Sequence, residues 1–132
     1  MTAPPLHPDV ETFISQHVNS VEQLETLLLM RADPDRTWDA AAINAELRTS
    51  LISAADRLCE LERSGLIVAN SSSPSRYRYE PVDPRIRRVI DLVADAYRER
   101  RVSVTILIFS KPPDALREFA DAFRIGKGKP NG

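Results

Sequence analysis

The segment between residues 47 and 80 places the strongest constraint on the fold, because a helical pattern in it is followed directly by a hairpin pattern. Leu51 to Ser64 repeats apolar residues every three or four positions, which predicts an amphipathic helix. Its apolar face is expected to hold Leu51, Ala54, Ala55, Leu58 and Leu61. Thr49 or Ser50 can cap the start of this helix, and Gly65 can adopt the left-handed conformation that ends it.

Two short β-prone runs come next and predict a hairpin. Leu66 to Ala69 and Arg76 to Glu80 are separated by a serine-rich loop around Pro74. Because side chains alternate along a strand, Tyr77 and Tyr79 should share one face and the arginines the other.

Further helices are predicted on the N-terminal side of this unit. Asp9 to Val18 has the apolar spacing of a short helix. Ser20-Val21-Glu22-Gln23 has the form of a capping box, so a helix should begin there and end near Ala32-Asp33-Pro34. Thr37 is expected to cap another helix, Trp38 to Leu47.

A long helix is predicted after the hairpin, with Asp83 as its cap and Pro84 in its first turn. Its apolar positions form a heptad-like seam: Ile86, Ile90, Val93, Tyr97, Val104 and Leu107. The β-branched run Val102 to Phe109 also suits a strand, but we favour a continued helix because the seam keeps its phase through the run. Asp114 to Ile125 is predicted as a final amphipathic helix, and residues 126–132 as a disordered tail.

Composition indicates a small globular protein rather than a membrane protein or a secreted one. The chain has 132 residues, of which 42% are hydrophobic, and this suits one ordinary domain. Its longest nearly uncharged apolar run, Val102 to Phe109, is too short to span a bilayer. The proline-rich start, Met1 to Pro8, lacks the basic and apolar regions of a signal peptide, so we expect a cytoplasmic protein.

The net charge of −1 hides an uneven distribution along the chain. Residues 1–63 contain 11 acidic and 5 basic side chains, a balance of −6. Residues 76–101 contain 8 arginines and 5 acids, a balance of +3. A polyanionic partner would therefore be attracted to the middle of the chain.

Helix, short turn, helix, glycine and hairpin is the order of elements in a winged helix-turn-helix. The sequence from Leu58 to Ile67, LCELERSGLI, resembles the end of the recognition helix in MarR-like and related bacterial regulators. The predicted fold is therefore mainly α with a small β-hairpin wing. The domain prediction is an N-terminal arm and short helix over residues 1–19, a winged helix-turn-helix over 20–82, and a long helix plus C-terminal helix over 83–125.

The resemblance implies binding of double-stranded DNA by the helix that begins at Leu51 and by the wing. The residues it assigns to base edges or phosphates on this helix are Thr49, Ser50, Ser53 and Arg57. On the wing, Arg76 and Arg78 suit phosphates or the minor groove. The alternative for these side chains is that they form an ordinary solvated surface. The alternative function is a protein-protein interaction module, which the acidic Asp56 and Glu60 on the same helix favour.

The seam from Ile86 to Leu107 exceeds what one small winged domain needs to bury, so it predicts a homodimer, although it can also pack against the protein's own helices. The 132 residues contain no glycine-rich phosphate loop and no nucleophile motif, and Cys59 is the single cysteine. No metal site, cofactor or enzymatic activity is predicted. The leading hypothesis is a dimeric transcriptional regulator that binds DNA.

Overall fold

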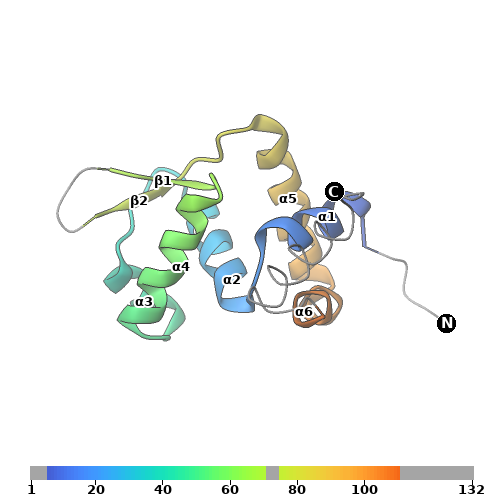
Figure 1. The fold of residues 1–132 in the computed structure, drawn as a ribbon, viewed down its shortest axis with the longest axis horizontal. Coiled ribbons are helices and arrows are strands. Elements are labelled where there is room, and N and C mark those ends of the chain that lie inside the picture. Colours follow the sequence, from blue (N-terminus) through green and yellow to red (C-terminus); the bar gives the residue numbers. More distant parts are fainter. Residues whose placement is uncertain (1–5, 71–74, 111–132) are drawn as a thin grey trace, which may run out of the picture.

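Helices dominate the computed structural model of this protein, which describes residues 6–70 and 75–110. The elements follow the order α1 (Pro8–His17), α2 (Val21–Arg31), α3 (Ala40–Leu47), α4 (Leu51–Arg63), β1 (Ile67–Ala69), β2 (Tyr77–Tyr79), α5 (Pro84–Glu99) and α6 (Arg101–Phe109). The predicted helix over 114–125 and the predicted tail over 126–132 lie outside the described residues. Figure 1 shows the hairpin and α4 at one end of the molecule, with α1, α5 and α6 at the other.

The start of α2 confirms the capping box. The Ser20 hydroxyl accepts a hydrogen bond from the Gln23 backbone N–H at 3.0 Å. The Gln23 amide oxygen accepts from the Asn19 backbone N–H at 2.6 Å, and its nitrogen donates to the His17 carbonyl at 3.0 Å. Gln23 is buried, so its polar atoms need these partners. They fix the turn between α1 and α2.

The start of α3 differs from the prediction. The helix begins at Ala40, and Asp39 rather than Thr37 caps it by accepting from the Ala42 N–H at 2.9 Å. Trp38 lies outside the helix and exchanges two backbone hydrogen bonds of 2.7 Å with Tyr77. This bridge buries the indole of Trp38 against the hairpin. If Trp38 were helical, its backbone could not keep both hydrogen bonds to Tyr77.

Helix α4 has the predicted ends. Ser50 caps it, and Gly65 follows it with a φ of 78°, the left-handed conformation expected of this glycine. Its buried face is narrower than predicted: Ala54, Leu58 and Leu61 are buried, whereas Leu51 and Ala55 are exposed. The first turn of α4 faces the polar beginning of α2, so no apolar layer covers Leu51 there.

Strands β1 and β2 form the predicted hairpin. They pair antiparallel in a register that places Ile67 opposite Tyr79 and Ala69 opposite Tyr77. Tyr79 is buried and Tyr77 is half-buried, as the alternation predicted for the tyrosine face. The inner face of the hairpin therefore closes the core, while Arg78 is exposed on the other face.

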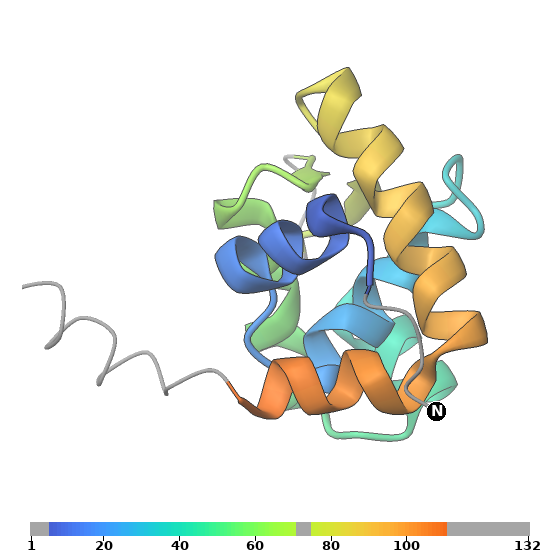
Figure 2. The same cartoon turned by 90° about the vertical axis from the view of Figure 1, so that its right-hand side faces the viewer.

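Residues 102–109 are helical, so the prediction of a helix there is confirmed and the strand alternative is wrong. The helix is not continuous, however. Arg100, with φ −137° and ψ 53°, separates α5 from α6, and its N–H still bonds to the Ala96 carbonyl at 2.6 Å. Figure 2 shows that α6 leaves the end of α5 at a steep angle and that α1, α5 and α6 frame one end of the molecule. The change of direction lets α6 pack back against the core.

The predicted seam is part of the protein's own core. Ile90, Val93 and Val104 are fully buried, and they join the same hydrophobic cluster as the apolar residues of α1, α2 and α4. Its other members, Ile86, Tyr97 and Leu107, are partly buried against that cluster. The seam thus packs on the chain's own helices, the second of the two readings given above. The three fully buried residues are not accessible to a second copy, which corrects their assignment as dimer contacts.

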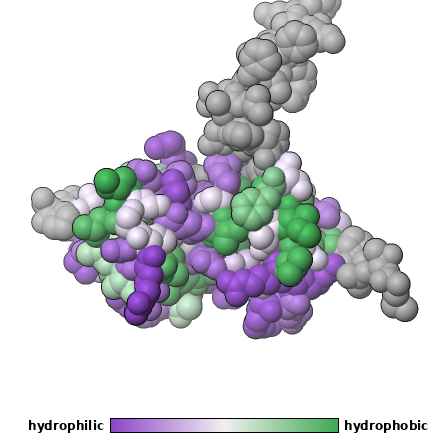
Figure 3. Space-filling view, turned by 90° about the horizontal axis from the view of Figure 1, so that it is seen from below, coloured by the Kyte–Doolittle hydropathy of each residue, from purple (hydrophilic) through white to green (hydrophobic). Residues whose placement is uncertain are grey.

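Two groups of large apolar side chains remain on the surface. On α6, Val102, Ile106 and Phe109 are exposed by 71%, 60% and 75%. At the start of α4, Leu51 and Ile52 are exposed by 55% and 77%. Figure 3, which views the molecule from below, shows hydrophobic patches towards the left and the right of that face. Such groups commonly mark surfaces that contact another molecule. Within the described ranges, no helix is both long and apolar enough to cross a membrane.

Candidate nucleic-acid interface

Helix α4 and the hairpin lie next to one another at the end of the molecule away from α5 and α6 (Figure 1). The outward side of α4 carries exposed residues along its length: Leu51, Ile52, Ala55, Asp56, Cys59, Glu62 and Arg63. Ile52 and Cys59 are seven positions apart, two helical turns, and therefore share one line along the helix. The outward side of α4 is thus apolar at its start and mixed in charge towards its end.

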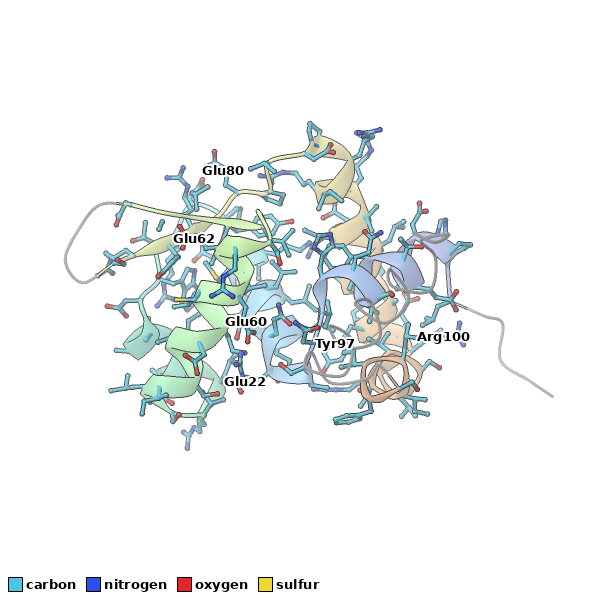
Figure 4. The ribbon with its side chains drawn as sticks, viewed as in Figure 1. Glu22, Glu60, Glu62, Glu80, Tyr97 and Arg100 are labelled. Atoms are coloured by element: carbon cyan, nitrogen blue, oxygen red, sulfur yellow. The ribbon has the colours of Figure 1, made fainter. Side chains whose placement is uncertain are left out.

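Ser53 and Arg57, both predicted to contact DNA, are turned towards α2. The Ser53 hydroxyl lies 2.7 Å from both carboxylate oxygens of Glu22. Arg57 donates to the two carboxylate oxygens of Glu60 at 2.8 and 2.9 Å, and it lies 3.4 Å from Glu22. Figure 4 shows the labelled Glu22 and Glu60 beside the α2 side of α4. The expectation that Ser53 and Arg57 face outward is therefore corrected.

The charge around Arg57 explains why it stays in place. Burial lowers the pKa of Arg57, but the hydrogen bonds and negative charges of Glu60 and Glu22 outweigh it, and the pKa is raised overall. The arginine side chain is 19% exposed and its partners are 29% and 24% exposed. Ion pairs shielded to this degree are screened less than surface pairs. Sequence reasoning missed this cluster because Glu22 lies 35 residues from Arg57 along the chain.

The turn between α3 and α4 presents three polar residues to solvent. Thr49 and Ser50 are exposed, and the Ser50 hydroxyl also accepts from the Ser53 N–H at 3.0 Å as the helix cap. Arg48 is exposed and has a φ of 58°, and it forms no ion pair with any residue of the described ranges. Arg48 was not among the predicted contacts. Its place in the turn between α3 and α4 was the signal that could have identified it.

Both predicted wing arginines have acidic partners. Arg76 lies 3.5 Å from Asp39 and donates to the Thr37 hydroxyl at 3.2 Å, which joins the wing to the segment before α3. Arg78 pairs with Glu80 two residues further along the strand, and both of these side chains are about half exposed. Exposed pairs of this kind contribute little to stability and can be exchanged for another anion. The Arg76 and Arg78 side chains are exposed to a similar degree, 43% and 46%, but Arg76 also bonds the segment before α3.

The part of the chain that the structure describes offers no cluster of three or more histidine, cysteine, aspartate or glutamate side chains that could hold a metal ion. The acids near the interface are instead paired with arginines or exposed singly. What the arrangement presents is a surface for contact, with apolar and polar side chains on α4 and cationic side chains around it.

The two crossed helices α3 and α4 followed by a hairpin define a winged helix-turn-helix protein, which confirms the predicted fold class. The fold is similar to that of solved MarR-type structures. It matches Sco5413, a MarR family transcriptional regulator from Streptomyces coelicolor, with a TM-score of 0.55 at 14% identity over 88% of this chain and 78% of that one. It also matches a mutant of MepR from S. aureus bound to an oligodeoxyribonucleotide, with a TM-score of 0.50 at 14% identity over 89% and 86% of the two chains. No protein family and no curated protein matches the sequence.

Proposed function

We propose that this protein is a transcriptional regulator that binds double-stranded DNA and is not an enzyme. The observation that carries the proposal is the exposed outward side of α4 beside an antiparallel wing, in a fold shared with a protein solved on an oligonucleotide. In a winged helix-turn-helix, the second helix of the pair enters the major groove and presents its N-terminal residues to the bases. Here that helix is α4, which lies at the end of the molecule opposite α5 and α6 (Figure 1).

The contacts proposed with DNA follow the exposed polar residues around α4. We assign the exposed Thr49 and Arg48 in the turn to phosphates at the edge of the groove, and Arg78 on the wing to the neighbouring backbone. Arg76 serves to hold the wing in place through Asp39. The Ser50 hydroxyl caps α4 by accepting from the Ser53 N–H. It can contact DNA only while it keeps this hydrogen bond.

A titration with duplex DNA at two salt concentrations tests the proposal. We expect binding that weakens steeply between about 50 mM and 200 mM salt, because phosphate contacts release counterions. Replacing Arg48 by alanine should reduce the slope of log K against log salt by about 0.9 for one lost phosphate contact. Arg98→Ala is the matched comparison, because Arg98 is an exposed arginine on α5, at the other end of the molecule, and its slope should equal that of the wild type. Failure to bind any duplex at the lower salt concentration would refute the proposal.

A dimer is part of the proposal, but its surface is the outer side of α6 rather than the seam. Val102, Ile106 and Phe109 are spaced by four and three positions, so they form one apolar stripe on that helix. Leu92 on α5 is 38% exposed and adds to the same end of the molecule. A second copy that covers this stripe would remove it from water and pair two α4 helices for two half-sites.

The second candidate is a protein-protein interaction module that uses α4 without DNA. The exposed Leu51 and Ile52 favour it, and so do Asp56 and Glu62, which would be repelled by phosphates. A pull-down that recovers one stoichiometric protein partner, together with no duplex binding in the titration above, would decide for this alternative.

A further inference from the structure

The first two turns of α4 present an unusual surface for a helix that enters the major groove. Its exposed side chains are Leu51, Ile52, Ala55 and Asp56. The donors that most often read guanine in this groove are arginine and lysine. The one arginine of these turns, Arg57, is held by Glu60 and Glu22.

This surface restricts the bases that α4 can recognise. The major groove contains one apolar group, the C5-methyl of thymine, and an exposed aliphatic side chain gains from covering it. The acceptor-only carboxylate of Asp56 cannot bond the O6 and N7 acceptors of guanine, but it can accept from the amino group of either adenine or cytosine. The selectivity of this surface therefore rests on the thymine methyl groups. We propose that Leu51, Ile52 and Ala55 recognise thymine methyl groups and that this protein therefore selects thymine-rich half-sites over guanine-rich ones.

The geometry places the three aliphatic side chains for one patch of the groove. Ile52 and Ala55 are three positions apart on the helix, so they lie on neighbouring turns of one face, and Leu51 flanks them. Ile52 is 77% exposed, so most of its surface is available for burial against DNA. The polar side chains that would otherwise compete for the bases here, Ser53 and Arg57, point to α2.

The inference rests on the proposed function, and the experiment separates the two. A random-sequence duplex library is first selected on the full-length protein, and the enriched duplex is then made in two forms, with thymine and with deoxyuridine at the same positions. Deoxyuridine lacks the C5-methyl and keeps the O4 acceptor, so any difference in affinity reports the methyl groups alone.

We expect thymine enrichment in the selected library and about fourfold weaker binding for each contacted thymine replaced by deoxyuridine, from the free energy of burying one methyl group. In Ile52→Ala the ratio of the two affinities should fall towards one. Val82→Ala is the matched control, because Val82 is 76% exposed and lies in the segment that joins the wing to α5. Its ratio should equal that of the wild type.

Each result has one meaning. If no duplex binds at either salt concentration, the proposed function fails and the inference with it. If duplexes bind but the thymine and deoxyuridine forms bind equally, the protein contacts DNA without reading methyl groups, and the inference is overturned while the function stands. If the ratio persists in Ile52→Ala, whose circular dichroism verifies folding, Ile52 does not read the methyl groups and its assignment is overturned.

Discussion

At the scale of single residues, Glu22 does more for the geometry of the interface than any arginine on it. It lies two residues after the Ser20 cap in sequence, and in space its carboxylate accepts from Ser53 and lies beside Arg57. These contacts connect the start of α2 to the first half of α4. They join the two helices and turn the side chains of Ser53 and Arg57 towards α2.

Removing the Glu22 carboxylate should therefore destabilise the fold. Glu22→Ala leaves the Ser53 hydroxyl without its acceptor in a partly buried position, and we expect a loss of about 1–3 kcal/mol in the free energy of unfolding. Glu22→Gln keeps an acceptor for Ser53 and should lose less. Urea unfolding of both variants measures the difference, and equal stability of Glu22→Ala and the wild type would show that the cluster does not hold α2 and α4 together.

At the scale of elements, the sequence predicted the helices whose ends it encodes locally. Ser20, Ser50, Asp83 and Gly65 all have the capping roles expected of them, because a cap depends on residues within one turn. The start of α3 was mispredicted because the backbone of Trp38 is hydrogen-bonded to that of Tyr77, a residue far along the chain. Pairing across such distances leaves no trace in local patterns.

The same distinction applies to the interface. The outward position of α4 and the wing followed from the order of elements, but the orientations of Ser53 and Arg57 did not. Their direction is set by Glu22, whose proximity arises only when α2 and α4 pack. The break between α5 and α6 at Arg100 was also missed. The spacing of the apolar residues fits two helices that meet at an angle as well as it fits one straight helix.

The cap of α5 gives a prediction about pH. The backbone N–H of Arg85 donates to the Asp83 carboxylate at 2.9 Å, and this bond lowers the pKa of Asp83 below its ordinary value of 3.8. Because folding lowers the pKa of Asp83, the ionised cap stabilises the fold at pH values above the pKa of Asp83 in the unfolded chain. This stabilisation is lost as the pH falls through the lower pKa of Asp83 in the folded protein. The cap should therefore weaken only in acid.

Asp83→Asn tests this, because asparagine caps helices as well as aspartate does but does not titrate. We expect the wild type to lose more of its unfolding free energy than Asp83→Asn between about pH 6 and pH 2.5, in the window set by the carboxylate. Chemical unfolding at the two pH values gives the comparison. A parallel loss in both proteins would mean that Asp83 does not contribute to acid sensitivity.

At the scale of the whole molecule, two apolar surfaces lie at opposite ends, one on α4 and one on α6 (Figure 3). We propose that the first contacts DNA and that the second contacts a second copy of the chain. Both helices carry an isoleucine exposed by more than half: Ile52 by 77% and Ile106 by 60%. The two surfaces can therefore be tested with the same substitution.

Ile106→Glu should convert the dimer to a monomer, because it places a charge in the middle of the proposed apolar contact. Ile52→Glu is the matched variant and should remain a dimer. Sedimentation equilibrium of both proteins measures their mass in solution. A dimeric Ile106→Glu protein, or a wild type that is monomeric throughout, would show that the α6 stripe is not the dimer surface.

If duplex DNA covers the outward side of α4, as we propose, it should shield Cys59. It is the single cysteine of the chain, it is exposed, and it shares the line of Ile52 along the helix. The rate of thiol alkylation, followed by mass spectrometry, should fall several-fold when a duplex is bound and return when high salt releases it. An unchanged alkylation rate on DNA-saturated protein would contradict the account, because the duplex would then lie on another face.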